Sequence, residues 1–272
     1  MTLRTRNRIN IGISAFSALI LALDITLAVL QILNGTFAVP LSGMAHDGKH
    51  LLLTKYNPDV VVISLYIQIL YVTVTAYLIF RSFEKTQAPE LIFISLFLAS
   101  VLLESIRLWI TLFHLAGTFS AFLIFCANIN LFARIMTPLS LFMLAVMGTE
   151  SQRQNAEQNI IITIIIVLML CIAVPMNTVG ITPDLSVKYG FGNVISASTV
   201  IMLLLAAATF SVTNRKKGFA DSITAGFWLM SYGSVEIFDC TDILKAAVTF
   251  SALFIGTYIY IRGLHNQYMW AF

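Results

Sequence analysis

The stretch SVEIFDCTDILKAAVTF, residues 234–250, joins two apolar runs and decides how many helices this chain contains. Four charged side chains lie within it: Glu236, Asp239, Asp242 and Lys245. If the stretch were the middle of one long helix, it would bury a lysine beside carboxylates, as a retinal-binding protein requires. If it were a turn between two helices, the same charges would lie at a membrane surface.

The length of the surrounding apolar sequence favours the turn. Residues 222–262 number 41, and one helix of that length would be about 60 Å long, twice the hydrocarbon thickness of a bilayer. Two helices, at about 222–238 and 243–261, fit far better. The aspartates and threonine of DCTD favour turns and helix caps. We therefore expect Lys245 in a first helical turn, where it reaches outward or pairs with Asp242.

The composition is that of an integral membrane protein. Hydrophobic residues make up 58% of the 272 residues and charged residues only 11%, whereas soluble domains carry about 25% charged residues. Apolar runs of about 20 residues recur, the length that a membrane-spanning helix needs. The sequence predicts an all-α, polytopic integral membrane helix bundle in one transmembrane domain, residues 1–272. Eight transmembrane helices are expected, or seven if residues 222–262 form one.

Six further helices precede the two already placed. They are expected at about 10–33, 59–80, 91–113, 121–147, 159–177 and 194–213. The first run is too long for the apolar region of a signal peptide and no convincing cleavage site follows it, so we interpret it as a retained helix. The segment TVGITPDLSVKYGFGN, residues 178–193, has the glycine and proline content of a turn-rich connection.

The distribution of positive charge predicts a cytoplasmic N-terminus. With alternating helices, nine lysines and arginines fall on the N-terminal side and three on the other, as the positive-inside rule requires. The nine are Arg4, Arg6, Arg8, Arg81, Lys85, Arg153, Arg215, Lys216 and Lys217, and the three are Lys49, Lys55 and Lys188. We expect a multi-pass protein of a cell membrane, the bacterial cytoplasmic membrane. The net charge of +3 gives no reason to expect a nucleic-acid partner.

Four ionisable residues lie near the centres of predicted helices: Asp24, Glu104, Arg107 and Arg134. Each costs about 2.5–3.5 kcal/mol at a helix centre, so they are expected to compensate one another. Their formal charges sum to zero. Glu104 and Arg107 are three residues apart and therefore share a helix face. A short link makes the third and fourth helices antiparallel neighbours, so Arg134 on the fourth helix can reach that face.

Two asparagine side chains, Asn128 and Asn130, lie near this predicted charge network and belong to the same candidate site. Two interpretations stay open. The network is either a set of polar contacts that fixes helix packing, or a ligand or proton site.

The sequence gives no positive support for an enzyme. It contains no glycine-rich phosphate loop, GxSxG or HExxH motif, and DCTD is interpreted as a turn and not as a prenyl-diphosphate motif, so no catalytic residue and no cofactor is assigned. Cys126, Cys171 and Cys240 lack CxxC spacing and are interpreted as packing residues. His46 and His50 are four residues apart, but Gly48 and a loop setting argue against a metal site.

Two segments resemble the membrane-associated sensor modules that precede bacterial histidine kinases and diguanylate cyclases. They are LFARIMTPLSLFMLA, residues 131–145, and SVEIFDCTDILKAAVTFSALFIGTYIY, residues 234–260. The resemblance implies a non-enzymatic sensor or signalling subunit with a small or lipid-like ligand near Glu104, Arg107 and Arg134. Those modules are usually fused to an output domain, so we expect a separate cytoplasmic signalling protein or membrane partner here.

Two other functions fit the same residues. In a small-molecule transporter or transporter subunit, the intramembrane charges would line a path. In a structural subunit of a membrane complex, they would only pack helices together.

The eight-helix prediction has a direct topological test. A reporter domain fused after Phe272 should have cytoplasmic activity, because an even number of spans returns the C-terminus to the side of the N-terminus. An external reporter would restore the seven-helix alternative and the buried Lys245.

Overall fold

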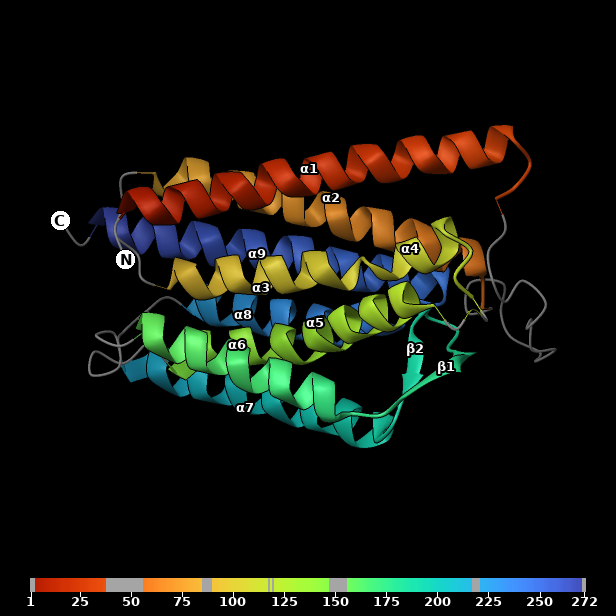
Figure 1. The fold of residues 1–272 in the computed structure, drawn as a ribbon. Helices are drawn as coiled ribbons and strands as arrows, with labels where there is room; N and C mark the ends of the chain where they lie inside the picture. Colours follow the sequence, from red (N-terminus) through yellow and green to blue (C-terminus); the bar gives the residue numbers. More distant parts are fainter. Residues whose placement is uncertain are drawn as a thin grey trace.

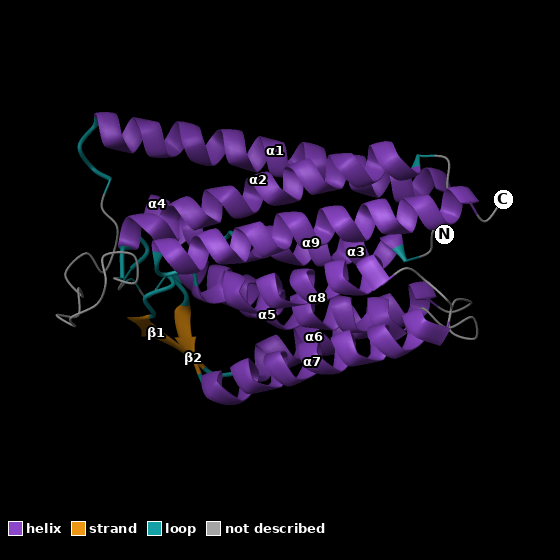
Figure 2. Ribbon diagram, turned by 180° about the vertical axis from the view of Figure 1, so that it is seen from behind, coloured by secondary structure: helices purple, strands orange, loops and turns teal. Residues whose placement is uncertain are grey.

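The computed structural model describes residues 3–37, 56–84, 90–116, 118, 120–146, 156–216 and 221–270. These residues form an all-α bundle with one small two-stranded sheet (Figures 1 and 2). The helices are α1 (Leu3–Leu33), α2 (Pro58–Phe83), α3 (Leu91–Glu104), α4 (Arg107–Leu112), α5 (Ala121–Val146), α6 (Ala156–Ala173), α7 (Gly192–Lys216), α8 (Asp221–Glu236) and α9 (Ile243–Trp270). The strands are β1 (Met176–Ile181) and β2 (Val187–Tyr189).

The helices run alternately up and down, so the connections gather at two ends of the bundle (Figure 1). We call the end that holds both chain termini the terminal end. The opposite end, which holds β1, β2 and the α8–α9 turn, is the hairpin end. Because α4 continues α3 within one apolar span, Leu91–Leu112, the described helices make eight passes along the bundle.

The stretch from residue 234 to residue 250 contains a turn between two helices, as the length of the surrounding apolar region, residues 222–262, predicted. α8 ends at Glu236, a single 3-10 turn covers Ile237–Asp239, and α9 begins at Ile243. The backbone carbonyl of Asp242 accepts the first bond of α9, from the Ala246 amide at 2.9 Å. The single-helix alternative for this region is therefore wrong.

Six described helical spans are long and apolar enough to cross a membrane: Arg4–Leu33, Pro58–Phe83, Leu91–Leu112, Ala121–Val146, Gly192–Lys216 and Ile243–Tyr268. The remaining two passes, α6 and α8, are shorter. The prediction of a multi-pass helical membrane protein is confirmed at this level.

Six helices form a closed ring, in the order α2, α3, α5, α7, α8, α9 and back to α2. α1 packs outside the ring against α2 and α3, and α6 packs outside it against α5. In the most apolar stretch of Leu91–Leu112, 78% of the residues are buried, against 17% in α1. The α3–α4 span is therefore central, while most of α1 presents apolar side chains to its surroundings.

The predicted boundaries need four corrections. The first helix begins at Leu3 and not near residue 10. The expected helix at 91–113 is interrupted at Ser105 and Ile106. The connection 178–193, expected as turns, contributes β2 and most of β1. The last helix continues to Trp270 instead of ending near residue 261, because its final turns still pack on the bundle, where the Tyr268 hydroxyl donates to Glu90 Oε2 at 2.6 Å.

α8 and α9 pack backbone against backbone through glycines. Gly226 and Gly233 on α8, and Gly256 and Gly263 on α9, are each seven residues apart, so each pair lies along one helix face. A Cβ atom at Gly256 would lie 2.7 Å from the Met230 amide nitrogen and 2.9 Å from the Gly226 carbonyl oxygen. Small residues let helices in a membrane approach this closely, and the gain is van der Waals contact.

We expect Gly256→Ala to destabilise the bundle by about 1–3 kcal/mol, because the new methyl group meets rigid backbone atoms and not a movable side chain. Thermal unfolding in detergent should show the loss. Gly12→Ala is the matched control, since no atom lies within 4 Å of a Cβ at that helical glycine. An equal stability change in both variants would contradict the close approach of α8 and α9.

Candidate functional site

A β-hairpin folds back into one end of the helix bundle. β1 and β2 are antiparallel, with Met176 opposite Tyr189 and Ile181 opposite Val187. The turn between them is closed by two bonds from Thr182, whose amide and hydroxyl each donate to the Ser186 carbonyl at 2.8 Å. Asp184, Leu185 and Ser186 of this turn are buried in protein, which is the condition under which irregular backbone is tolerated in a membrane protein.

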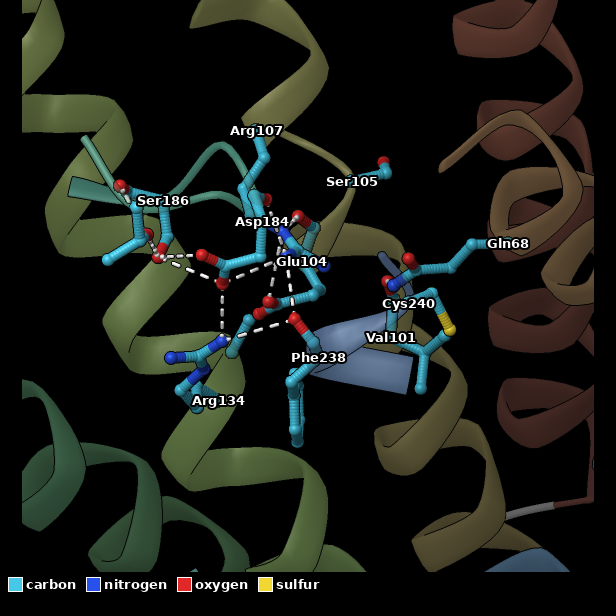
Figure 3. A network of polar contacts seen from close by, with 12 residues as sticks. Gln68, Val101, Glu104, Ser105, Arg107, Arg134, Asp184, Ser186, Phe238 and Cys240 are labelled. Carbon is cyan, nitrogen blue, oxygen red and sulfur yellow. Dashed lines mark hydrogen bonds and ion pairs between the residues drawn. The ribbon is translucent and has the colours of Figure 1, made fainter. Parts of the chain in front are cut away.

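The tip of the hairpin carries Asp184, which meets two arginines from different helices (Figure 3). Asp184 Oδ2 lies 2.9 Å from Arg134 Nη2 on α5 and 3.4 Å from Arg107 Nη1 on α4. Arg107 Nη1 also donates to the Asp184 carbonyl oxygen at 2.9 Å. The Ser186 hydroxyl donates to the same carboxylate. The carboxylate is therefore held from three sides.

The same two arginines hold the turn between α8 and α9. The carbonyl oxygen of Phe238 accepts from Arg107 Nη1 at 3.1 Å and from Arg134 Nη2 at 3.4 Å. The Arg134 guanidinium carbon also lies 5.1 Å from the centre of the Phe238 ring. We call Arg107, Arg134, Asp184 and the Phe238 carbonyl the arginine clamp. It joins four segments: α4, α5, the hairpin and the turn between α8 and α9.

The interruption between α3 and α4 places Glu104 and Arg107 beside one another. Ser105 tightens the chain here, since its amide and hydroxyl both donate to the Leu102 carbonyl, at 3.1 and 2.6 Å. Arg107 Nε then lies 3.2 Å from Glu104 Oε1, so the pair predicted from their spacing is present. The buried side chain of Asn130 on α5 lies close to the same carboxylate.

The charges of this buried site balance. Glu104 and Asp184 oppose Arg107 and Arg134, and all four residues are less than 9% exposed. Burial alone would raise the pKa of the Asp184 carboxyl, but the two guanidinium groups outweigh burial and hold its pKa below the ordinary value. Asp184 is therefore a carboxylate at neutral pH. Removing one member of a buried ion pair typically costs about 3–5 kcal/mol, because it leaves an uncompensated charge.

Two of the predicted network residues lie apart from the clamp. Asp24 is on α1, where its Oδ1 accepts from Trp109 Nε1 at 3.2 Å and its backbone carbonyl accepts from the Tyr66 hydroxyl. α1 packs outside the ring, so Asp24 cannot serve as the second acid of the network. Asn128 is half-buried, and no hydrogen bond ties it to the clamp in the chain as described. Asp184 takes the position that the sequence analysis gave to Asp24.

The charged residues of the α8–α9 turn form a separate, partly exposed group. Lys245 Nζ lies 3.1 Å from Glu236 Oε2 across the turn, with side chains 33% and 28% exposed. This differs from the predicted pairing of Lys245 with Asp242, whose Oδ1 accepts instead from the Thr241 hydroxyl. The Asp239 carbonyl accepts from the Thr241 amide. Both aspartates thus flank the turn, as expected.

Sequence reasoning missed Asp184 because it sits in a connection and not in an apolar run. The available signal was its isolation: it is the only acid in residues 178–193, directly after Pro183. Once Glu104 is assigned to Arg107 and Asp24 is set aside, this lone carboxylate is the remaining candidate partner for Arg134.

The described residues contain no group of three histidine, cysteine or acidic side chains that could hold a metal ion. His46 and His50 lie outside the described residues. No protein-family model, curated protein or solved structure shows a detectable match to this chain.

We expect Arg134→Gln to lower the free energy of unfolding by about 3–5 kcal/mol, because Asp184 then loses the closer of its two cations inside the protein. Adding Asp184→Asn to Arg134→Gln should recover part of the loss, since it removes the uncompensated charge. The measurement is thermal unfolding in detergent for both single variants and the double variant. Strict additivity would argue against a direct Asp184–Arg134 interaction.

The control for this comparison is Glu236→Gln, which breaks an ion pair at the same end of the bundle. The Glu236–Lys245 pair is partly exposed, so the variant should cost only about 0–1 kcal/mol. If Glu236→Gln lowered the free energy of unfolding as much as Arg134→Gln does, burial of the ion pair would not be what determines the size of the loss.

Proposed function

We propose that this protein is a non-enzymatic membrane sensor or signalling subunit in which the hairpin is the element that changes state. One observation carries the proposal: two buried arginines from separate helices hold the tip of a membrane-surface hairpin through a single carboxylate, Asp184. The ion pairs that hold the hairpin are thus concentrated at one residue, and bonds from Arg134 to the Tyr189 hydroxyl and from the Tyr56 hydroxyl to the Pro183 carbonyl add to them. A ligand that alters those bonds would act on four segments together.

Asp184 can be regarded as an internal anion bound by the two arginines. An anionic ligand that binds better to the released arginines than to the clamped ones would shift the hairpin toward release, by its difference in affinity for the two states. The change would reach α8 and α9 because the Phe238 carbonyl shares both donors. It would reach the α3–α4 span through Arg107, which follows the helix interruption.

The orientation that fits this proposal places the terminal end in the cytoplasm. Most of the described cations lie near that end: Arg4, Arg6, Arg8, Arg81, Arg215, Lys216 and Arg262. Near the hairpin end the described cations are Lys188, Lys245 and the two buried arginines of the clamp, Arg107 and Arg134. Positive charge concentrates on the cytoplasmic side of membrane proteins. We therefore propose a bacterial cytoplasmic-membrane location with an external ligand side and a cytoplasmic output partner.

The resemblance of residues 131–145 and 234–260 to bacterial sensor modules supports the same proposal. The first segment supplies Arg134 and the second supplies Phe238. These are two of the four members of the arginine clamp, so the resembling segments meet at one place in the structure.

The test uses two cysteine reporters in a variant whose native cysteines, all buried, are replaced by alanine. Val187→Cys reports on the hairpin, where Val187 is 3% exposed. Ser95→Cys reports on α3 toward the terminal end, where Ser95 donates to Asn10 Oδ1 at 2.7 Å. We expect Asp184→Asn to raise thiol labelling at residue 187 several-fold, since the clamp loses its carboxylate, and to change the labelling rate at residue 95.

Glu236→Gln is the control and should change neither labelling rate, because its ion pair is outside the clamp. A released hairpin with unchanged labelling at residue 95 would show that the clamp is packing alone, as a structural subunit requires. Accumulation of a solute by proteoliposomes would instead indicate a transporter.

A further inference from the structure

A cavity of about 440 Å³ lies beside the arginine clamp. Its lining comes from three elements: Arg134 of α5, the hairpin from Thr182 to Tyr189, and the first turn of α7 from Gly192. No acidic side chain is among its lining residues. The cavity therefore joins one face of the clamp to the beginning of a long helix.

The start of α7 gives this cavity a positive electrostatic potential. α7 has 25 residues and no acid in its first turn. The residue before it, Phe191, has no side-chain acceptor that could cap the free amides of Gly192 and Asn193. Such amides, together with the helix dipole, make a ready site for anions. Lys188 also lines the cavity, and its aliphatic part packs against Gly180, which keeps the side chain across the hairpin.

Arg134 supplies an independent sign of a ligand. The residue is 8% exposed, lines the cavity, and has donors left over after the clamp is formed. A guanidinium has five N–H donors. Three have partners: the Tyr189 hydroxyl, Asp184 Oδ2 and the Phe238 carbonyl. Nε is enclosed by protein, so the donor left for a ligand is the second N–H of Nη1, whose first N–H donates to the Tyr189 hydroxyl. A buried cation with a spare donor, next to the amides that begin a helix, matches an oxyanion with several oxygens.

The rim of the cavity indicates that the anion carries an apolar chain. Phe191 is 70% exposed and Val194 is 65% exposed, and both line the cavity at the start of a membrane-spanning helix. We propose that this cavity binds a phosphate group, and that the phosphate is the head of an amphiphile whose chain lies along α7. The idea that this amphiphile is the ligand of the sensor rests on the proposed function. Binding of the phosphate group in the cavity does not depend on that function.

The test compares two cavity variants with one control in native mass spectrometry of the full chain in neutral detergent. Phosphatidylglycerol is the lipid probe, phosphatidylcholine the neutral comparison, and inorganic phosphate the free anion. Lys188→Gln should weaken phosphatidylglycerol binding about tenfold, the loss of one charge-assisted contact. Asn193→Asp should abolish it, because a carboxylate at the start of α7 repels the anion while suiting the helix dipole.

Lys245→Gln is the control: it removes a lysine from the same end of the bundle, outside the cavity, and should leave binding unchanged. Binding of inorganic phosphate alone, lost in Asn193→Asp, would support the phosphate site and assign it to a free anion. Equal binding by the wild-type protein and Asn193→Asp overturns the proposal. Thermal unfolding of the Asn193→Asp variant, measured in the same detergent, should show that the variant is folded.

The cysteine reporter at residue 187 separates this proposal from the proposed function. Phosphatidylglycerol binding without any change in labelling would retain the site and reject the sensor mechanism. Labelling that responds to Asp184→Asn in a protein that binds neither lipid nor phosphate would retain the mechanism and reject the site.

Discussion

The bond between Asp184 and its two arginines is the interaction on which the hairpin end of this structure depends. Arg107 and Arg134 come from different helices, and neither can be buried without a counter-charge. The hairpin supplies one such charge at its tip, Glu104 supplies the other beside Arg107, and the Phe238 carbonyl accepts further bonds from both arginines. Four segments that are far apart in the sequence are thus fixed by one compact group of polar atoms.

The packing of α8 against α9 follows a different physical principle. α8 and α9 approach through glycines, and the gain is van der Waals contact between backbones. Contacts of this kind set distances between helices but do not respond to ligands. The polar clamp and the cavity beside Arg134 are therefore where a change of charge can alter the structure, which is why both functional proposals concern the hairpin end.

The sequence predicted the helices well and the candidate site in part. Apolar run length is a local property, so most helix boundaries followed from it, and the break before Ile243 followed from the thickness of a bilayer. The pairing of Glu104 with Arg107 followed from their spacing. The interruption at Ser105 and the hairpin strands did not, because both are short: one is a single turn closed by bonds from Ser105 to Leu102, and the other depends on pairing across a turn.

The sequence by itself determined that the protein is a multi-pass helix bundle and that its intramembrane arginines need acids. Composition and the length of the apolar runs predict the helix bundle. The need for acids follows because a charge inside a membrane is costly in any arrangement of helices. Only the tertiary structure decided which acid serves them. Asp24 was the obvious candidate by helix position, but α1 lies outside the ring, and a turn 50 residues beyond Arg134 brings Asp184 to it instead. Which side chains come into contact depends on how the helices pack, and helix packing cannot be predicted from a local sequence pattern.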